Sequence, residues 1–194
     1  MQTNGRRINL NTKNLVYLAI LSALVVILQI VSNVTGGILI VPITLTLVPI
    51  VLGGALVNKW SGAWLGLVFA LAVLFTGAAN GFLAVNFVGT VVTVIVKGVL
   101  SGLFAGLIYS ALEKVNKYLA ILIAGIVAPV TNTGIFIIGC YVFFYDYVLS
   151  LAGGEGMFIF IITVFAGVNF LVELGLNMLL SPAILRIVNI KSAE

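Results

Sequence analysis

Long apolar stretches, separated by short polar connections, make up almost the whole chain. Six of them are close to or above the length of about 20 residues that a membrane-crossing helix needs. These predicted spans are residues 15–31, 42–57, 60–75, 82–112, 118–149 and 157–187. The second and third are short, whereas the last three have about 30 residues each, or roughly 45 Å of helix, and are expected to tilt, bend or protrude. Because the apolar runs are continuous and do not alternate, the pattern predicts an all-α membrane bundle and excludes a β-barrel.

Composition supports the same class. Of the 194 residues, 62% are hydrophobic and 7% are charged, whereas a soluble domain carries about 25% charged residues. Lipid is therefore expected to cover much of the surface. No connection is long enough for a soluble domain, so we expect one transmembrane domain over residues 1–194.

The cations predict the orientation of the bundle. With six spans, the lysine and arginine residues at or beyond the ends of the spans all fall on one side. They are Arg6, Arg7, Lys13, Lys59, Lys114, Lys117, Arg186 and Lys191. Cations accumulate in the cytoplasmic connections of membrane proteins, so the pattern predicts a multi-pass protein of the cell membrane with both termini in the cytoplasm. The membrane also explains the net charge of +4, and no nucleic-acid partner is expected.

Several kinds of chemistry are excluded by residues that the chain lacks. It has no histidine and a single cysteine, Cys140, which removes most metal ligands and the histidine-activated nucleophiles. It also has no G-x-x-x-x-G-K-[ST] phosphate-binding loop. We therefore expect no catalytic residue, metal site or cofactor, and any use of ATP would fall to a partner subunit.

Polar residues concentrate inside the last three spans, where they are costly and commonly functional. Lys97 and Glu173 lie about halfway along their spans. Asn86, Thr90 and Thr93 share a helix face with Lys97, and Asn169 and Asn177 share one with Glu173. Thr131, Asn132 and Thr133 lie at similar depth in the fifth span, just after Pro129. Asn80 lies above them in the outer connection.

Two interpretations of this concentration stay open. Lys97 and Glu173 could pair and clamp two helices, with the amides and hydroxyls joining helices by hydrogen bonds. Alternatively, the polar groups line a binding cavity in which Lys97 meets an anionic part of a ligand. Three spans contribute at similar depth, which favours the cavity. Aromatic residues near the outer side would close over it or anchor the helices at the interface, namely Phe82, Phe87, Tyr141 and Tyr145.

Small residues four positions apart indicate close helix approach at two places. One pair is Ala19 and Ala23 in span 15–31. The other is Gly62 and Gly66 in span 60–75, which we expect to pack closely against a neighbouring helix.

Taken over essentially its whole length, the chain resembles the S-components of energy-coupling factor (ECF) vitamin transporters. The resemblance rests on size, six spans and cytoplasmic termini, and on four stretches: Ala19-x-x-x-Ala23, the segment 42–54, Thr131-Asn-Thr-Gly134, and the face Asn169, Glu173 and Asn177. The sequence looks closest to the pantothenate branch of the family.

The resemblance implies a function. S-components capture a water-soluble vitamin with high affinity in an outward-facing pocket. A transmembrane coupling subunit and two ATPase subunits then drive release inside. It implies that Ala19 and Ala23 dock onto the coupling subunit and that residues 32–41, with Gly36 and Gly37, form a lid. The predicted substrate-binding residues are Asn80, Asn86, Thr90, Lys97, Thr131, Asn132, Asn169 and Glu173.

Other functions remain open from the residues. Riboflavin, folate or cobalamin are alternative substrates. A stand-alone proton-coupled transporter with Glu173 as the titrating group is a second class. A structural membrane subunit, in which Lys97 and Glu173 only clamp helices, is a third.

Overall fold

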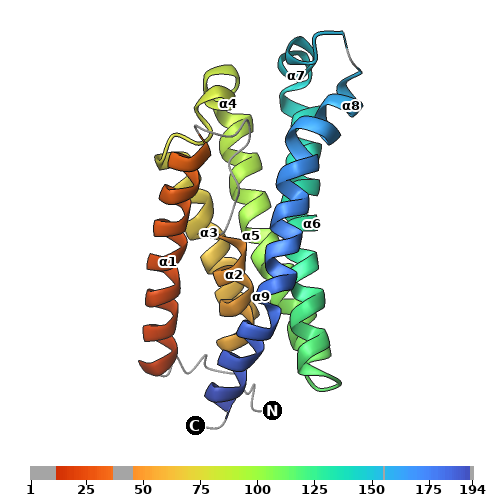
Figure 1. Ribbon diagram of the computed structural model, residues 1–194. Helices are drawn as coiled ribbons and strands as arrows, with labels where there is room; N and C mark the ends of the chain where they lie inside the picture. Colours follow the sequence, from red (N-terminus) through yellow and green to blue (C-terminus); the bar gives the residue numbers. More distant parts are fainter. Residues whose placement is uncertain (1–11, 37–45, 155, 193–194) are drawn as a thin grey trace, which may run out of the picture.

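The computed structural model describes residues 12–36, 46–154 and 156–192 (Figure 1). Its regular structure is helical, as predicted. The elements are α1 (Thr12–Gly36), α2 (Leu47–Leu56), α3 (Lys59–Phe75), α4 (Asn80–Val85), α5 (Phe87–Leu112), α6 (Lys117–Phe143), α7 (Tyr145–Leu151), α8 (Met157–Phe160), the π-helical η1 (Ile161–Gly167) and α9 (Val168–Ser192). The long helices run side by side. The start of α1 and the end of α9 lie at one end of the bundle, and α4, α7 and α8 lie at the other.

Among the described residues, four helices are long and apolar enough to cross a membrane: Thr12–Val34, Phe87–Leu112, Lys117–Phe143 and Phe170–Lys191. Two of the six predicted spans correspond to shorter apolar helices, α2 and α3. In α2 most side chains are buried by neighbouring helices, including those of Leu47, Ile50 and Val51. An apolar run of about 10–14 residues is typical of a helix buried in protein, so α2 is hydrophobic because of the core around it. Residues 42–45 of that predicted span lie outside the described residues.

The long predicted spans differ from the observed helices at their outer ends. The predicted helix 82–112 is interrupted at Asn86, whose backbone is extended and whose Oδ1 accepts a hydrogen bond from the Gly89 N–H (2.8 Å). Asparagine at this position caps the start of α5. The predicted helix 118–149 ends at Phe143, and α7 begins after Phe144, whose backbone is not helical (φ −132°, ψ 20°). The last span begins with α8 and the π-helical turn η1 before α9 follows.

Glycine-to-glycine contact joins α3 to α5. A Cβ atom at Gly66 would clash with the Gly98 carbonyl, and one at Gly62 would clash with the Gly102 carbonyl. The two backbones touch at these positions, which only glycine permits. The predicted close packing of Gly62 and Gly66 is therefore confirmed, and α5 is held firmly where it carries Lys97.

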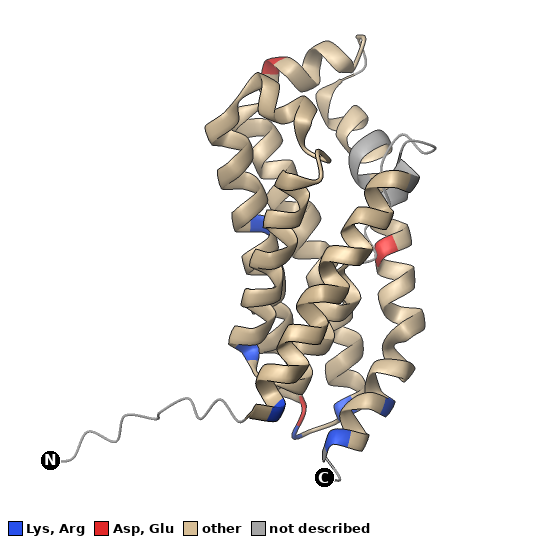
Figure 2. Cartoon of the chain, turned by 90° about the vertical axis from the view of Figure 1, so that its left-hand side faces the viewer, with Lys and Arg blue, Asp and Glu red and all other residues tan. Residues whose placement is uncertain are grey.

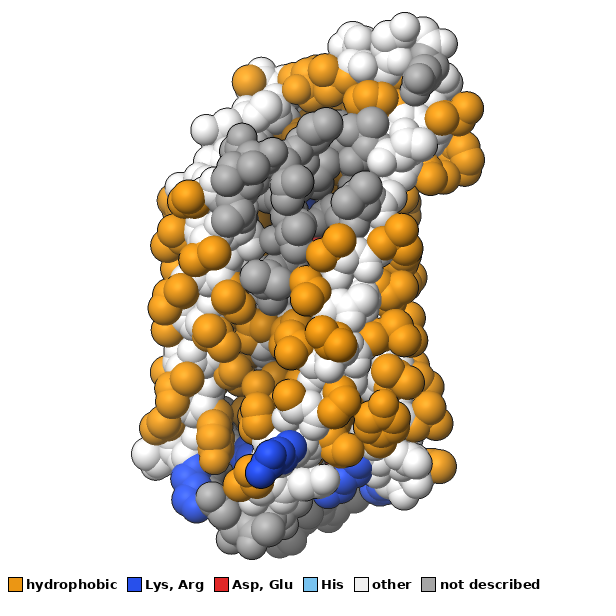
Figure 3. All heavy atoms as spheres, viewed as in Figure 1, with side chains coloured by type: hydrophobic (Ala, Val, Ile, Leu, Met, Phe, Trp, Pro, Cys, Tyr) orange, Lys and Arg blue, Asp and Glu red, His pale blue; other side chains and the backbone are white. Residues whose placement is uncertain are grey.

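Charge is distributed unevenly along the bundle. Lysine and arginine gather at the end where α1 starts and α9 ends (Figure 2). Above that cationic end, apolar side chains are spread along both sides of the face shown in Figure 3. This distribution is the one that the predicted orientation requires, although Arg6 and Arg7 lie outside the described residues.

Candidate functional site

The candidate site begins where α5 and α6 pack against each other, in the half of α5 that follows α4. Thr93 and Lys97 are four residues apart and share one face of α5. A Cβ atom at Gly139 of α6 would lie 2.6 Å from the Thr93 Oγ1 atom, so the threonine side chain fills the space above this glycine. One turn from Gly139, the ring of Phe136 faces Lys97. The helices of predicted spans four and five thus pack together around Thr93 and Lys97, while the convergence of their polar residues stays a prediction.

The Lys97 ammonium lies between aromatic rings inside the bundle. Its Nζ atom is 5.3 Å from the ring centroid of Phe136 and 5.8 Å from that of Phe69 on α3. Both distances allow cation–π attraction. The Glu173 carboxyl group also acts on the ammonium electrostatically. An ammonium held within an apolar bundle is costly, and ring faces compensate less well than an anion would. The site is therefore suited to an anionic ligand group.

The second polar face comes from α9. Glu173, Asn177 and Ser181 follow one another at intervals of four, and all three are buried, Glu173 with 0% of its surface exposed. The Asn177 Nδ2 atom donates to the Glu173 carbonyl (2.9 Å), and the Ser181 hydroxyl donates to the Asn177 carbonyl (2.7 Å). This face packs on α6 at Gly125, where a Cβ atom would lie 3.5 Å from that of Asn177. Asn169, predicted on the same face, has a side chain that lies outside the described part of the chain.

Buried oxygens at these helices lack a hydrogen-bond donor among the described residues. They include the Oγ1 of Thr93, the Oδ1 of Asn132 and the Oδ1 of Asn177. Asn132 lies one turn before Phe136 on α6, so its side chain shares the face on which the ring meets Lys97. Buried polar atoms are almost always hydrogen-bonded in native proteins. These oxygens are well suited to accept hydrogen bonds from the hydroxyl or amide groups of a ligand.

Comparison with known proteins identifies the family. The chain matches the model of the family described as "ECF transporter, substrate-specific component" over residues 13–185. The chain belongs to this family. No curated protein and no solved structure matches it significantly. ECF substrate-specific components are membrane subunits that bind small substrates and work with coupling and ATPase modules, and they are not enzymes.

Within this S-component, the remaining predicted binding residues lie in surroundings different from those of Lys97, Asn132 and Glu173. Asn86 caps α5, and the Thr90 hydroxyl donates to the Asn86 carbonyl (2.7 Å), so both already make hydrogen bonds at the start of that helix. Asn80 is exposed at the beginning of α4, and Thr131 is partly buried on α6. Their contact with a substrate remains a prediction.

An aromatic cluster lies between Lys97 and the end of the bundle that carries α4 and α7. Phe82 of α4 packs edge-on against Phe136 (ring centroids 5.6 Å apart), Phe144 (5.0 Å) and Tyr147 (5.6 Å). Since Phe136 also lies over Lys97, the cluster and the ammonium form one contiguous unit. The sequence indicated Phe82 as a cover. It did not single out Phe69 or Phe136, which no motif distinguishes from other apolar positions.

On α1, the side chains of Ala19 and Ala23 are exposed. The residues of α1 that pack into the bundle, such as Leu21 and Val25, lie on another face of the helix. Packing within the S-component therefore does not explain the two alanines, which are available to another membrane helix.

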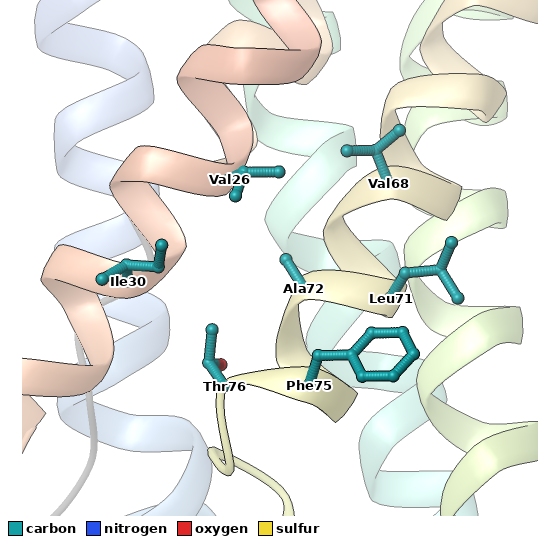
Figure 4. Close-up of a pocket in the computed structure, with 7 residues that line it drawn as sticks. All are labelled: Val26, Ile30, Val68, Leu71, Ala72, Phe75 and Thr76. Atoms are coloured by element: carbon teal, nitrogen blue, oxygen red, sulfur yellow. The ribbon is translucent and has the colours of Figure 1, made fainter.

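An apolar groove lies between α1 and α3, away from the candidate site (Figure 4). It has a volume of about 390 Å³ and is lined by Val26, Ile30, Val68, Leu71, Ala72, Phe75 and Thr76. Phe75 is 86% exposed. Such a lining offers almost no hydrogen-bonding groups, so the groove suits lipid chains and not a polar vitamin.

Proposed function

We propose that this S-component captures pantothenate with high affinity for an ATP-driven ECF uptake transporter. The observation that carries the proposal is the Lys97 ammonium, held inside the bundle over the rings of Phe136 and Phe69. A ligand carboxylate would add a close anionic partner to the two rings and to the electrostatic effect of Glu173. Pantothenate offers one carboxylate, two hydroxyls and an amide. The hydroxyl and amide donors match the buried oxygens of Thr93 and Asn132.

The rest of the proposal concerns topology and partners. Its four long helices cross the cell membrane, the shorter α2 and α3 complete the six-helix bundle with α2 shielded from lipid by its neighbours, and both termini lie in the cytoplasm. The coupling subunit docks on the exposed alanines of α1, and two ATPase subunits supply the energy. The absence of a phosphate-binding loop from the sequence fits this division of work.

Thermal unfolding of the purified protein against a vitamin panel tests the substrate. A ligand that binds only the folded state raises the melting temperature, by an amount that grows with its concentration over Kd. The panel contains pantothenate, riboflavin, folate, thiamine, biotin and cobalamin. We expect a shift with pantothenate alone, and no shift in Lys97→Met or Asn132→Ala. A shift with riboflavin, folate or cobalamin instead would show that the substrate assignment is wrong but would keep the function of a vitamin-binding S-component.

A stand-alone proton-coupled transporter is the second candidate, because Glu173 is fully buried within the bundle. An intramembrane carboxyl group is a common proton carrier in transporters. Vesicles containing only this protein distinguish the two functions. Uptake driven by a pH gradient, and lost in Glu173→Gln, would favour the proton-coupled transporter. Uptake that appears only with the coupling module and ATP would favour the S-component mechanism.

A further inference from the structure

At the cationic end of the bundle, Lys191 joins three helices through one side chain. Its Nζ atom donates a hydrogen bond to the Asn14 Oδ1 atom of α1 (2.9 Å) and another to the Leu56 carbonyl at the end of α2. It also lies 4.8 Å from the ring centroid of Tyr17 on α1. Lys191 itself belongs to the last turn of α9. A single cation therefore ties the starts or ends of α1, α2 and α9 together.

Each of these contacts has a clear physical basis. The last carbonyls of a helix have no partner within the helix and carry partial negative charge, which a lysine can satisfy. Leu56 is the last residue of α2, so Lys191 supplies this cap from another helix. The amide oxygen of Asn14 and the face of Tyr17 are further acceptors for a cation. The ammonium is thus stabilised by three different groups, two of which belong to α1.

The contact matters because many side chains in the first turns of α1 face away from the bundle. Leu15, Val16 and Ile20 are exposed, as are Ala19 and Ala23. The helix packs on α2 and α3 through its opposite face, for example where Leu21 meets Gly53. Asn14 and Tyr17 lie two to nine residues before the two alanines, within about two and a half turns of helix. Their attachment to Lys191, together with the packing of Leu21, therefore constrains the direction in which the alanines face.

We propose that Lys191 is a positioning residue for partner docking, which holds the start of α1 so that Ala19 and Ala23 face the coupling subunit. The inference rests on the proposed docking role of the two alanines. It assigns to α9, the helix that carries Glu173 and Asn177, a direct mechanical link to the docking helix. A cap that served only the stability of α2 would leave docking unchanged once the protein had folded.

The test measures the affinity of the purified S-component in nanodiscs for the coupling module, meaning the coupling subunit with its ATPases from the same organism. We expect Lys191→Met to weaken binding by at least about tenfold. Lys191→Arg keeps the charge and the donors and should stay close to the wild type. Arg186→Met removes a cation from the same helix end and serves as the matched control. The double variant Asn14→Ala with Tyr17→Leu removes only the α1 side of the contact.

The α1 double variant should weaken binding as much as Lys191→Met, even if the loss of the α2 cap impairs folding in the latter. Wild-type affinity in the double variant would overturn the proposal, and so would an equal loss in the Arg186→Met control. A separate pair, Ala19→Leu and Ala23→Leu, tests the docking face. If these two bind normally, the docking role itself fails. If they lose binding while the double variant does not, only the role of Lys191 fails.

A distance measurement gives a second readout that does not need the partner. Spin labels at Val16 of α1 and Ile190 of α9, both exposed, report the separation of the two helix ends in a Cys140→Ala background. We expect one narrow distance distribution for the parent protein and a broader one with Lys191→Met. A distance distribution in Lys191→Met that is as narrow as in the parent protein would contradict a positioning role.

Discussion

Substitution of Gly102 by alanine tests whether backbone contact between α3 and α5 supports the site. A Cβ atom at Gly102 would lie 2.5 Å from the Gly62 carbonyl carbon and nearer still to its oxygen. Ordinary van der Waals contact begins at 3.4 Å, so the helices must separate locally by at least 3.4 − 2.5 = 0.9 Å. Overpacking of this kind costs about 1–3 kcal/mol. The gain in helix propensity from Gly to Ala, about 1 kcal/mol, offsets only part of it.

The assay is thermal unfolding of the ligand-free protein in detergent. For a chain of this size, 1 kcal/mol corresponds to about 2–4 °C, so we expect the melting temperature of Gly102→Ala to fall by several degrees. Gly175→Ala on α9 is the matched control, because nothing lies within 4 Å of its added Cβ atom. It should unfold at or slightly above the wild-type temperature. If Gly102→Ala were as stable as this control, the close backbone contact would be refuted.

Three further predictions concern the site and its cover. Lys97→Met should abolish the pantothenate response. The ligand-free variant should be no less stable than the wild type, because the substitution removes a cation that is costly within the bundle. A destabilised variant would instead favour a structural clamp with Glu173. Phe82→Ala removes the central ring of the aromatic cluster and should speed both association and dissociation of the ligand in stopped-flow measurements, whereas unchanged rates would exclude a cover at this position. Asn86→Ala removes the α5 cap and should lower stability by about 1 kcal/mol without changing ligand affinity; a loss of affinity in calorimetry would show that the amide contacts substrate as the sequence predicted.

The sequence predicted the fold class well because hydrophobicity along the chain is a strong signal. Apolar stretches without alternation predict helices, and the all-helical structure confirms this. Local polar signals within those stretches are weaker. Asn86 resembles any polar residue inside a span until its extended backbone and cap are known, so the break between α4 and α5 was not anticipated. The shortness of α2 was visible, but its burial by other helices depends on tertiary packing.

Pairing between helices was the part that periodicity could not predict. Gly62 and Gly66 indicated a close approach, yet only the structure shows that Gly98 and Gly102 form the opposite side. The same limit applies to the site. A stripe of polar residues predicts which side chains share a face of one helix, whereas the rings around Lys97 come from α3 and α6.

Calorimetric titration of the ligand-free protein with pantothenate and with pantothenol tests the proposed function most directly. Pantothenol keeps the hydroxyls and the amide but carries an alcohol in place of the carboxylate. Removing one partner of a buried, hydrogen-bonded charge pair costs about 2–5 kcal/mol, so pantothenol should bind at least about 30-fold more weakly. In Lys97→Met, pantothenate should lose this advantage over pantothenol. Equal binding of the two compounds by the wild type would contradict the role of Lys97, and failure of pantothenate to bind would contradict the proposed substrate.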